Sequence, residues 1–484
     1  MPTMCEPPPR MRLAALPLLL AFLLAACQSM APDYQRPAAS VAAHYPQQPD
    51  STLPATTPLD WKTTFSDPQL QALISLALAN NRDLRVAALR VEEAMALYGI
   101  QRADLFPTIG AQVGLDRSRT PADLNLTGRP LVGSAYQAGL GLSSWEIDLW
   151  GRLRSLDDAA LHTAQASEAT RRAATLSLVT QVADAYLELG ELDERLAIAS
   201  DTIASRQESY RIYARRVEVG ASSRLNLTQI ETLLTQAQAL GAQLEQLRAQ
   251  RLNALTLLVG SPLELAPGQA RSVLDTVFPA LQPGLPSLLL TRRPDVLAAE
   301  YRLQAANANI GAARAAFFPS ISLTGQVGSA SAELSGLFRD GSHAWSFSPS
   351  ITLPIFTAGR LRNNLALSEI RRDISVANYE KTVQAAFREV ADALAARQWL
   401  TRQLAIAQTA VTVQAERARL STLRYDNGAA PFLDVLDAQR DLLSARQQLV
   451  QTRRALLSSS VALYAALGGD ASQAGAATPP RPGP

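Results

Sequence analysis

The chain has little net charge and no long apolar segment. Its 45 basic and 43 acidic residues leave a formal charge of +2, so it lacks the basic excess typical of a nucleic-acid-binding protein. The single continuous apolar run, residues 13–26, is too short to span a bilayer comfortably. With a mean hydropathy of zero, the composition excludes a polytopic helical membrane protein.

Residues for enzymatic chemistry are also sparse. The three histidines, His44, His162 and His343, are far apart and show no metal-ligand spacing, and the two lysines lie outside any phosphate-binding loop. The sequence contains no Gly-x-Ser-x-Gly elbow and no His-Glu-x-x-His helix. We therefore expect no enzymatic activity, no bound metal and no cofactor other than a covalent lipid.

That lipid is expected at one of the only two cysteines. A basic start at Met11-Arg12 and the apolar run lead to Leu24-Ala25-Ala26-Cys27, which is typical of a secretory signal peptide over residues 1–26. The run resembles a bacterial lipobox, in which the cysteine is acylated and becomes the mature N-terminus. By resemblance to bacterial lipoproteins, Gln28 favours sorting to the outer membrane. The alternative is an ordinary signal peptide followed by a buried cysteine, and the true start is either Met1 or Met11.

The mature chain divides into a tether, two copies of one unit, and a tail. Six prolines make residues 27–58 an extended, lipidated linker, and residues 469–484 have the composition of a disordered tail. Between them, Phe106-Pro107-Thr108-Ile109 recurs as Phe318-Pro319-Ser320-Ile321, and Gly151-Arg152-Leu153-Arg154 recurs as Gly359-Arg360-Leu361-Arg362. Landmarks in one order at an offset of about 210 residues indicate an internal repeat, with copies over 59–270 and 271–468.

Each copy contains a long helical pattern. Residues 360–427 hold no glycine and no proline, and apolar residues recur every three or four positions. At about 1.5 Å per residue, the helix would be roughly 100 Å long, which implies coiled-coil-like contacts. The matching run is 152–219. Shorter helices are expected at about 69–104, 222–259, 287–317 and 431–467.

Four short segments alternate apolar and polar residues instead. They predict strands at about 108–116, 135–146, 320–329 and 344–354, joined in pairs by loops 116–135 and 329–343. Their length and alternation match strands of a transmembrane barrel, and a small soluble sheet is the alternative. Four strands cannot close a membrane barrel, so several chains would have to share one: a dimer gives eight strands and a trimer twelve.

Several motifs then resemble one family. They are Pro32-Asp33-Tyr34-Gln35-Arg36-Pro37 after the lipobox, Trp145-Glu146-Ile147-Asp148-Leu149-Trp150-Gly151-Arg152, Arg292-Arg293-Pro294-Asp295-Val296, and Pro354-Ile355-Phe356-Thr357-Ala358-Gly359-Arg360. In order and spacing they resemble the TolC/OprM (NodT-type) outer-membrane efflux lipoproteins over nearly the whole mature chain.

The resemblance implies a mainly α fold with a membrane β-barrel. Three chains would share a twelve-stranded barrel in the outer membrane, and their duplicated helical hairpins would form a tunnel through the periplasm. The implied partners are two further copies, outer-membrane lipid, a periplasmic adaptor and an inner-membrane pump, commonly of the resistance–nodulation–division type. The implied function is a passive duct for small molecules in multidrug efflux.

The resemblance also assigns roles at the turn after residue 424. Asp434 and Asp437 are three apart and so share a helix face. They match family acids that ring the periplasmic entrance, and Leu433 matches a position that narrows the closed tip. In a trimer the six carboxylates would attract cations. The alternative is that both aspartates are ordinary charges that favour the N-terminal end of a helix dipole.

Further roles fall on the turns themselves. Arg424 and Tyr425 are candidates for ties that hold the tip shut. The exposed small residues of the two helix–turn–helix tips are candidate adaptor contacts: Gly220, Ala221, Ser222, Gly428, Ala429 and Ala430. Two other functions stay open, namely the same channel serving protein or polysaccharide secretion, and a lipid-anchored coiled-coil scaffold without a pore. The sequence does not identify the exported substrates.

Overall fold

The computed structural model describes residues 29–38, 41–42, 44–46, 60–270, 274–276, 278–279, 281 and 289–469. Cys27, the signal peptide, much of the linker and nearly all of the expected tail lie outside the described residues, so those expectations stay predictions. The described chain forms two compact units. One comprises residues 29–37, 91–167 and 299–379, and the other comprises the remaining described residues.

The elements of the first half of the chain recur in the second half. A short helix α2 (Trp61–Thr64) comes first. The first half is then α3 (Pro68–Asn80), α4 (Arg82–Ala103), β1 (Ile109–Thr120), β2 (Leu131–Ile147), α5 (Arg152–Glu218) and α6 (Arg224–Val259). The second half is α7 (Leu289–Arg292), α8 (Pro294–Ala315), β3 (Ser320–Ser331), β4 (His343–Thr352), α9 (Arg360–Asp426) and α10 (Phe432–Ala466). Helices α5 and α9 each have 67 residues, so the duplicated, mainly helical fold with four strands is confirmed.

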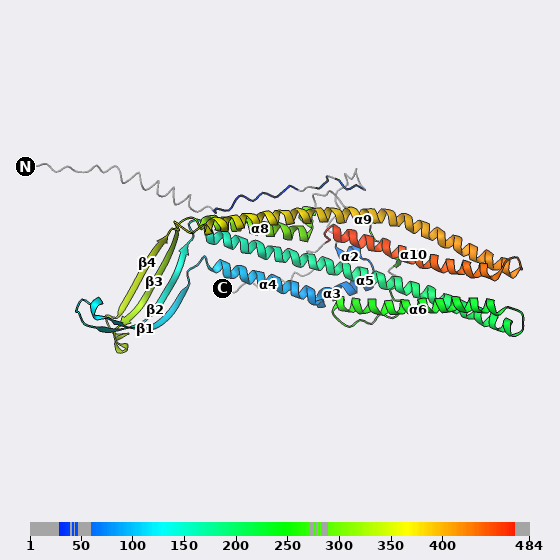
Figure 1. Ribbon diagram of the computed structural model, residues 1–484, viewed down its shortest axis with the longest axis horizontal. Coiled ribbons are helices and arrows are strands. Elements are labelled where there is room, and N and C mark those ends of the chain that lie inside the picture. Colours follow the sequence, from blue (N-terminus) through cyan, green and yellow to red (C-terminus); the bar gives the residue numbers. More distant parts are fainter. Residues whose placement is uncertain are drawn as a thin grey trace, which may run out of the picture. The chain divides into compact units, whose positions relative to one another are not determined.

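The four strands form one antiparallel sheet in the order β1-β2-β3-β4 (Figure 1). The register places apolar side chains of all four strands on one face, among them Val113, Leu140, Val327 and Trp345. The opposite face carries mainly glycine, serine and glutamine, such as Gln112, Gly139, Gln326 and Ser346. Val113 and Trp345 are 83% and 73% exposed, so the apolar face is uncovered in the single chain.

The strands differ from the expected ranges in two ways. β1 and β2 run further toward each other, so their loop shortens from the expected 116–135 to 121–130. One extra residue in β2 between Leu142 and Trp145 forms a β-bulge opposite β3, with Ser144 at a φ of 37°. Because the bulge reverses the alternation, Trp145 stays on the apolar face and β2 continues to Ile147.

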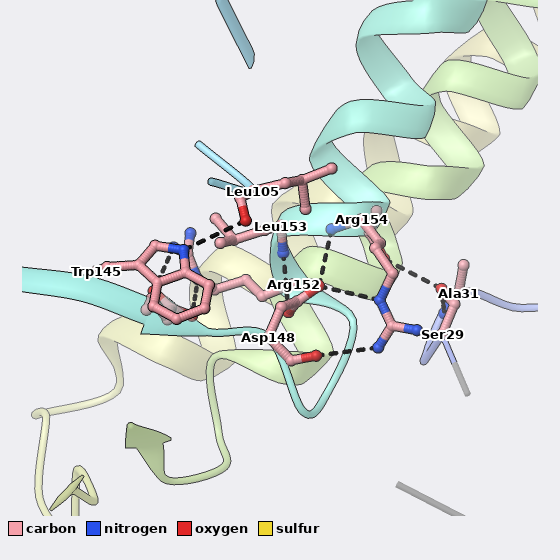
Figure 2. A network of polar contacts seen from close by, with 10 residues as sticks. Ser29, Ala31, Leu105, Trp145, Asp148, Arg152, Leu153 and Arg154 are labelled. Carbon is pink, nitrogen blue, oxygen red and sulfur yellow. Dashed lines mark hydrogen bonds and ion pairs between the residues drawn. The ribbon is translucent and has the colours of Figure 1, made fainter. Parts of the chain in front are cut away.

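A polar network joins β2 to the start of α5 (Figure 2). The two carboxylate oxygens of Asp148 accept from the backbone N–H groups of Leu153 and Arg154 at 3.1 and 3.0 Å. The Arg154 guanidinium donates back to the same carboxylate at 3.1 Å. On the strand side, Trp145 Nε1 donates to the Leu105 carbonyl at 3.2 Å. Asp148 therefore satisfies backbone donors at the start of α5 that the helix itself leaves without partners.

Residues 29–36, here called the N-terminal strap, run along one side of α8. Arg314 donates to the Met30 carbonyl at 3.5 Å, and Asn307 to the Pro32 carbonyl at 2.7 Å. A Cβ on Gly311 would lie 2.6 Å from the Ala31 nitrogen, so this position admits only glycine. Six extended residues from Met30 to Arg36 span about 20 Å, and so do the fourteen helical residues from Arg314 back to Glu300. The strap can therefore contact α8 along this whole length.

Glu300 holds the far end of the strap. Its carboxylate accepts from Tyr34 Oη at 3.0 Å and from Arg36 Nε and Nη2 at 2.8 and 3.0 Å. The Glu300 side chain is only 6% exposed. Burial, followed by the charge of Glu300, raises the pKa of Tyr34, so its hydroxyl remains a donor.

Glu300→Ala should loosen the strap, because it leaves Tyr34 and Arg36 without their shared acceptor. Since Arg36 is partly exposed, we expect a cost of about 1–2 kcal/mol and faster proteolysis of residues 29–46. The measurement is limited proteolysis with thermal unfolding. Glu416→Ala, which removes an exposed ion pair on α9, is the control; equal proteolysis of both variants would contradict the role of Glu300.

In the other unit, the helix expected at 69–104 is interrupted at Asn81. Its side-chain oxygen accepts from the Leu84 N–H at 2.8 Å and so starts α4, while its Nδ2 donates to the Leu258 carbonyl at 2.8 Å. Among the residues that the structure describes, no helix combines the length and the sustained apolar character that crossing a bilayer requires.

Candidate functional site

The candidate site is the end of the second unit where the α5–α6 and α9–α10 hairpins turn (Figure 1). The two turns have the same backbone. After α5, Ala221 N–H donates to the Arg216 carbonyl and Gly220 N–H to the Val217 carbonyl, at 2.7 and 3.1 Å. After α9, Ala429 and Gly428 repeat these bonds to Arg424 and Tyr425, at 2.8 and 2.9 Å. Both are Schellman motifs.

Glycine is required at one position of each motif. Gly220 and Gly428 have φ of 75° and 72°, a left-handed conformation that a side chain disfavours. A Cβ at either residue would meet nothing within 4 Å, so the requirement comes from the backbone and not from crowding. Ala221 and Ala429 are exposed, whereas Ser222 and Ala430 are half-buried. The candidate adaptor contacts thus form two similar, mostly open surfaces.

An aromatic cluster holds the two hairpins together below these turns. Phe432 stacks on Tyr213 with ring centroids 4.5 Å apart and lies 5.0 Å from Tyr425. Tyr213 Oη donates to Tyr425 Oη at 2.6 Å. Burial, together with this hydrogen bond, raises the pKa of Tyr213. The cluster joins α5 to both helices of the other hairpin, with Ile230 and Leu436 buried against it.

The candidate ties, Arg424 and Tyr425, make contacts within the chain. The Arg424 guanidinium donates to the Ala429 carbonyl at 3.2 Å, so it closes its own turn. Tyr425 accepts from Tyr213, and the Arg216 guanidinium lies 3.5 Å from its hydroxyl. Tyr425 therefore connects the two hairpins of one chain.

The two aspartates differ in their surroundings. Asp437 pairs with Arg440 at 3.1 Å, one turn further along α10. Asp434 is exposed, and its carboxylate has no ion pair or hydrogen bond among the described residues. Leu433 beside it is 48% exposed. The first repeat has Asn226 and Gln229 at the matching positions, so the unpaired acid belongs to one turn only.

Known proteins resemble this chain in both sequence and structure. The family model of outer membrane efflux proteins matches residues 73–261 and 285–469. The chain belongs to the outer membrane efflux protein family. It is 45% identical over 458 residues to the outer membrane protein OprJ of Pseudomonas aeruginosa, covering 93% of this chain and 95% of that protein. It is 46% identical over 462 residues to a probable efflux pump outer membrane protein, TtgC, of Pseudomonas putida, covering 93% and 94%.

Solved structures of this family agree with the fold. A membrane protein from Pseudomonas aeruginosa superposes with a TM-score of 0.85 at 44% identity, covering 91% of this chain and 98% of that one. The open state of the MtrE outer membrane channel of Neisseria gonorrhoeae superposes at 0.83 with 39% identity and the same coverage. The resemblance to TolC/OprM-type channels, the efflux function and the outer-membrane location are therefore confirmed for this chain.

The aromatic cluster is not evident from the sequence. Tyr213 and Tyr425 are 212 residues apart, and although Tyr425 is a candidate tie, nothing in the sequence pairs it with Tyr213. One signal was present, since aromatic residues are only 6% of the chain and three of them occur close to the two turns.

Phe432→Ala should separate the hairpins locally by removing the ring that both tyrosines contact. Because Phe432 is only partly buried, we expect a loss of about 2–3 kcal/mol at the tip, below the range for a fully buried phenylalanine. Hydrogen exchange of residues 213–225 and 424–433 would measure it. Leu433→Ala, at the exposed neighbouring position, should leave exchange nearly unchanged; similar exchange in both variants would contradict the role of the cluster.

Proposed function

We propose that three copies of this chain form a passive duct from the periplasm to the exterior. The main observation that supports this proposal is the sheet. Its apolar face suits contact with lipid and its polar face suits a water-filled lumen. In the single chain, the outer edges of β1 and β4 have no strand beside them among the described residues. Such edges are tolerated in lipid only if strands of other chains close the barrel, which gives twelve strands for three chains.

An apolar seam on α9 supports the same assembly. Trp399, Ile406, Val413 and Leu420 lie seven residues apart and are 43–68% exposed. Seven-residue spacing is the pattern of a coiled-coil contact, so this seam fits a helix of a neighbouring copy.

Val413→Glu should weaken the trimer, because it would place a carboxylate within that seam. We expect detergent-extracted protein to shift from trimer toward monomer in size-exclusion chromatography with light scattering. Thr412→Glu, which adds the same charge beside the seam, should leave the trimer intact. A Val413→Glu trimer of undiminished stability would show that the seam faces no neighbour.

At the entrance, we propose that Asp434 sets charge selectivity and that Leu433 narrows the closed tip. Three copies would bring three unpaired Asp434 carboxylates near the axis, with three Asp437 carboxylates already paired to Arg440. The unpaired set would attract cations more strongly than the paired set. Arg424 and Tyr425 stay candidate ties. They would help to close the tip through the Arg424–Ala429 and Tyr213–Tyr425 hydrogen bonds.

Asp434→Asn should therefore reduce cation selectivity more than Asp437→Asn. The measurement is the reversal potential of reconstituted single channels in a potassium chloride gradient. Asp441→Asn is the matched control, because Asp441 is already paired with Arg417 at 2.7 Å. An unchanged reversal potential in the Asp434→Asn channel would exclude the acid from the entrance.

We further propose a covalent lipid on Cys27, a periplasmic adaptor docking at residues 220–222 and 428–430, and a pump of the resistance–nodulation–division type. Relatives named as efflux pump outer membrane proteins support the proposed pump. The proposed role is conduction and not catalysis. Crosslinking cysteines at Ala221 and Ala429 to a co-expressed adaptor tests the docking.

A further inference from the structure

A buried arginine lies between the two hairpins. Arg206 on α5 is 5% exposed, and its Nη1 donates to the Leu233 carbonyl on α6. Its Nε and Nη2 are shielded from solvent and have no hydrogen-bond partner among the described residues. Burial lowers the pKa of Arg206, yet a guanidinium remains protonated at neutral pH. Two buried donors without acceptors on a charged group destabilise the fold. This edge of Arg206 is therefore suited to bind a ligand that supplies hydrogen-bond acceptors.

The two free nitrogens are the pair with which arginines of this chain bind carboxylates. Nε and Nη2 point from the same edge of the guanidinium and match the two oxygens of a carboxylate. In six other arginines this edge holds both oxygens of an acid, at 2.6–3.0 Å: Arg36, Arg152, Arg171, Arg211, Arg293 and Arg419. Arg206 offers the same edge and lacks the acid.

A pocket of about 310 Å³ lies beside Arg206, here called the hairpin pocket. It is lined by residues of α5, α9 and α10, including Ser205, Thr422, Leu442 and Arg446. Arg446 is exposed and has no ion pair among the described residues. Asp201 is the one acid in the lining, and no bond joins it to Arg206. The pocket is therefore polar and net positive, with an apolar side supplied by leucine.

We propose that the hairpin pocket binds small molecules that carry a carboxylate. The carboxylate would pair with Nε and Nη2 of Arg206, and Arg446 at the rim would add a second cation. Since both nitrogens are shielded, lining side chains must rotate to admit the ligand. A volume of about 310 Å³ is at the lower end for ligand pockets and suits an acid with one small ring.

Binding here would link the two hairpins. Arg206 belongs to α5, whereas Arg446 belongs to α10 of the other hairpin, so one ligand would contact both. Such binding is separate from the duct function, because it can be measured on the extracted protein without conduction.

The test is isothermal titration calorimetry of the full chain in detergent, with benzoate as the probe and benzamide as its uncharged counterpart. We expect one benzoate per chain and at least about tenfold weaker binding of benzamide. Arg206→Gln should raise the Kd for benzoate by about ten- to a hundredfold. Arg446→Gln should raise it by about two- to fivefold. Arg211→Gln, an exposed change on α5 outside the pocket, should leave it unchanged.

The proposal is overturned if benzoate does not bind the folded wild type, if benzamide binds equally well, or if Arg206→Gln binds as the wild type does. Circular dichroism and trimer size verify folding of each variant. Should Arg206→Gln fail to fold, Arg206→Lys keeps the charge without the two-pronged edge and should still lose binding. Should that variant fail too, the preference for benzoate over benzamide and the Arg446→Gln variant decide.

Discussion

Backbone hydrogen bonding at the edges of the sheet is the constraint on which the rest depends. Strands β1 and β4 each present one row of N–H and C=O groups without a partner strand in the single chain. Such edges are costly in lipid, so an apolar outer face is useful only if neighbouring chains supply the missing strands. The unpaired edges of the sheet are therefore the strongest reason for this chain to assemble with further copies.

The duplication supplies matching backbones with different side chains. Helices α5 and α9 end in the same Schellman motif, yet Asp434 and Asp437 of α10 are replaced by Asn226 and Gln229 at the equivalent positions of α6. Each chain therefore carries two turns of similar backbone, and only α10 has aspartates at these two positions. The aromatic cluster shows the same division, since Tyr425 and Phe432 of one repeat meet Tyr213 of the other. Duplication thus preserved shape while chemistry diverged.

Local patterns predicted much of this fold. The absence of glycine and proline from 360–427 and the alternation near Val113 and Leu140 required no knowledge of distant partners. Features that depend on such partners were missed. The break at Asn81 is anchored by Leu258, the bulge at Ser144 depends on register with β3, and the Tyr213–Tyr425 bond joins residues far apart in the chain. The Asp437–Arg440 ion pair could have been predicted from its three-residue spacing. It leaves Asp434 as the unpaired member of the two aspartates.

The N-terminal strap also limits where an anchor can reach. Contacts begin at Ser29, whose hydroxyl lies 3.1 Å from that of Ser155 near the start of α5. Two residues of chain extend at most about 7 Å, so an acylated Cys27 would lie within about 7 Å of Ser29. The attachment point of such a lipid would therefore stay close to the start of α5. Acyl chains inserted in the bilayer would then fix the distance of the nearby ends of α8 and α5 from the membrane, in addition to anchoring the chain.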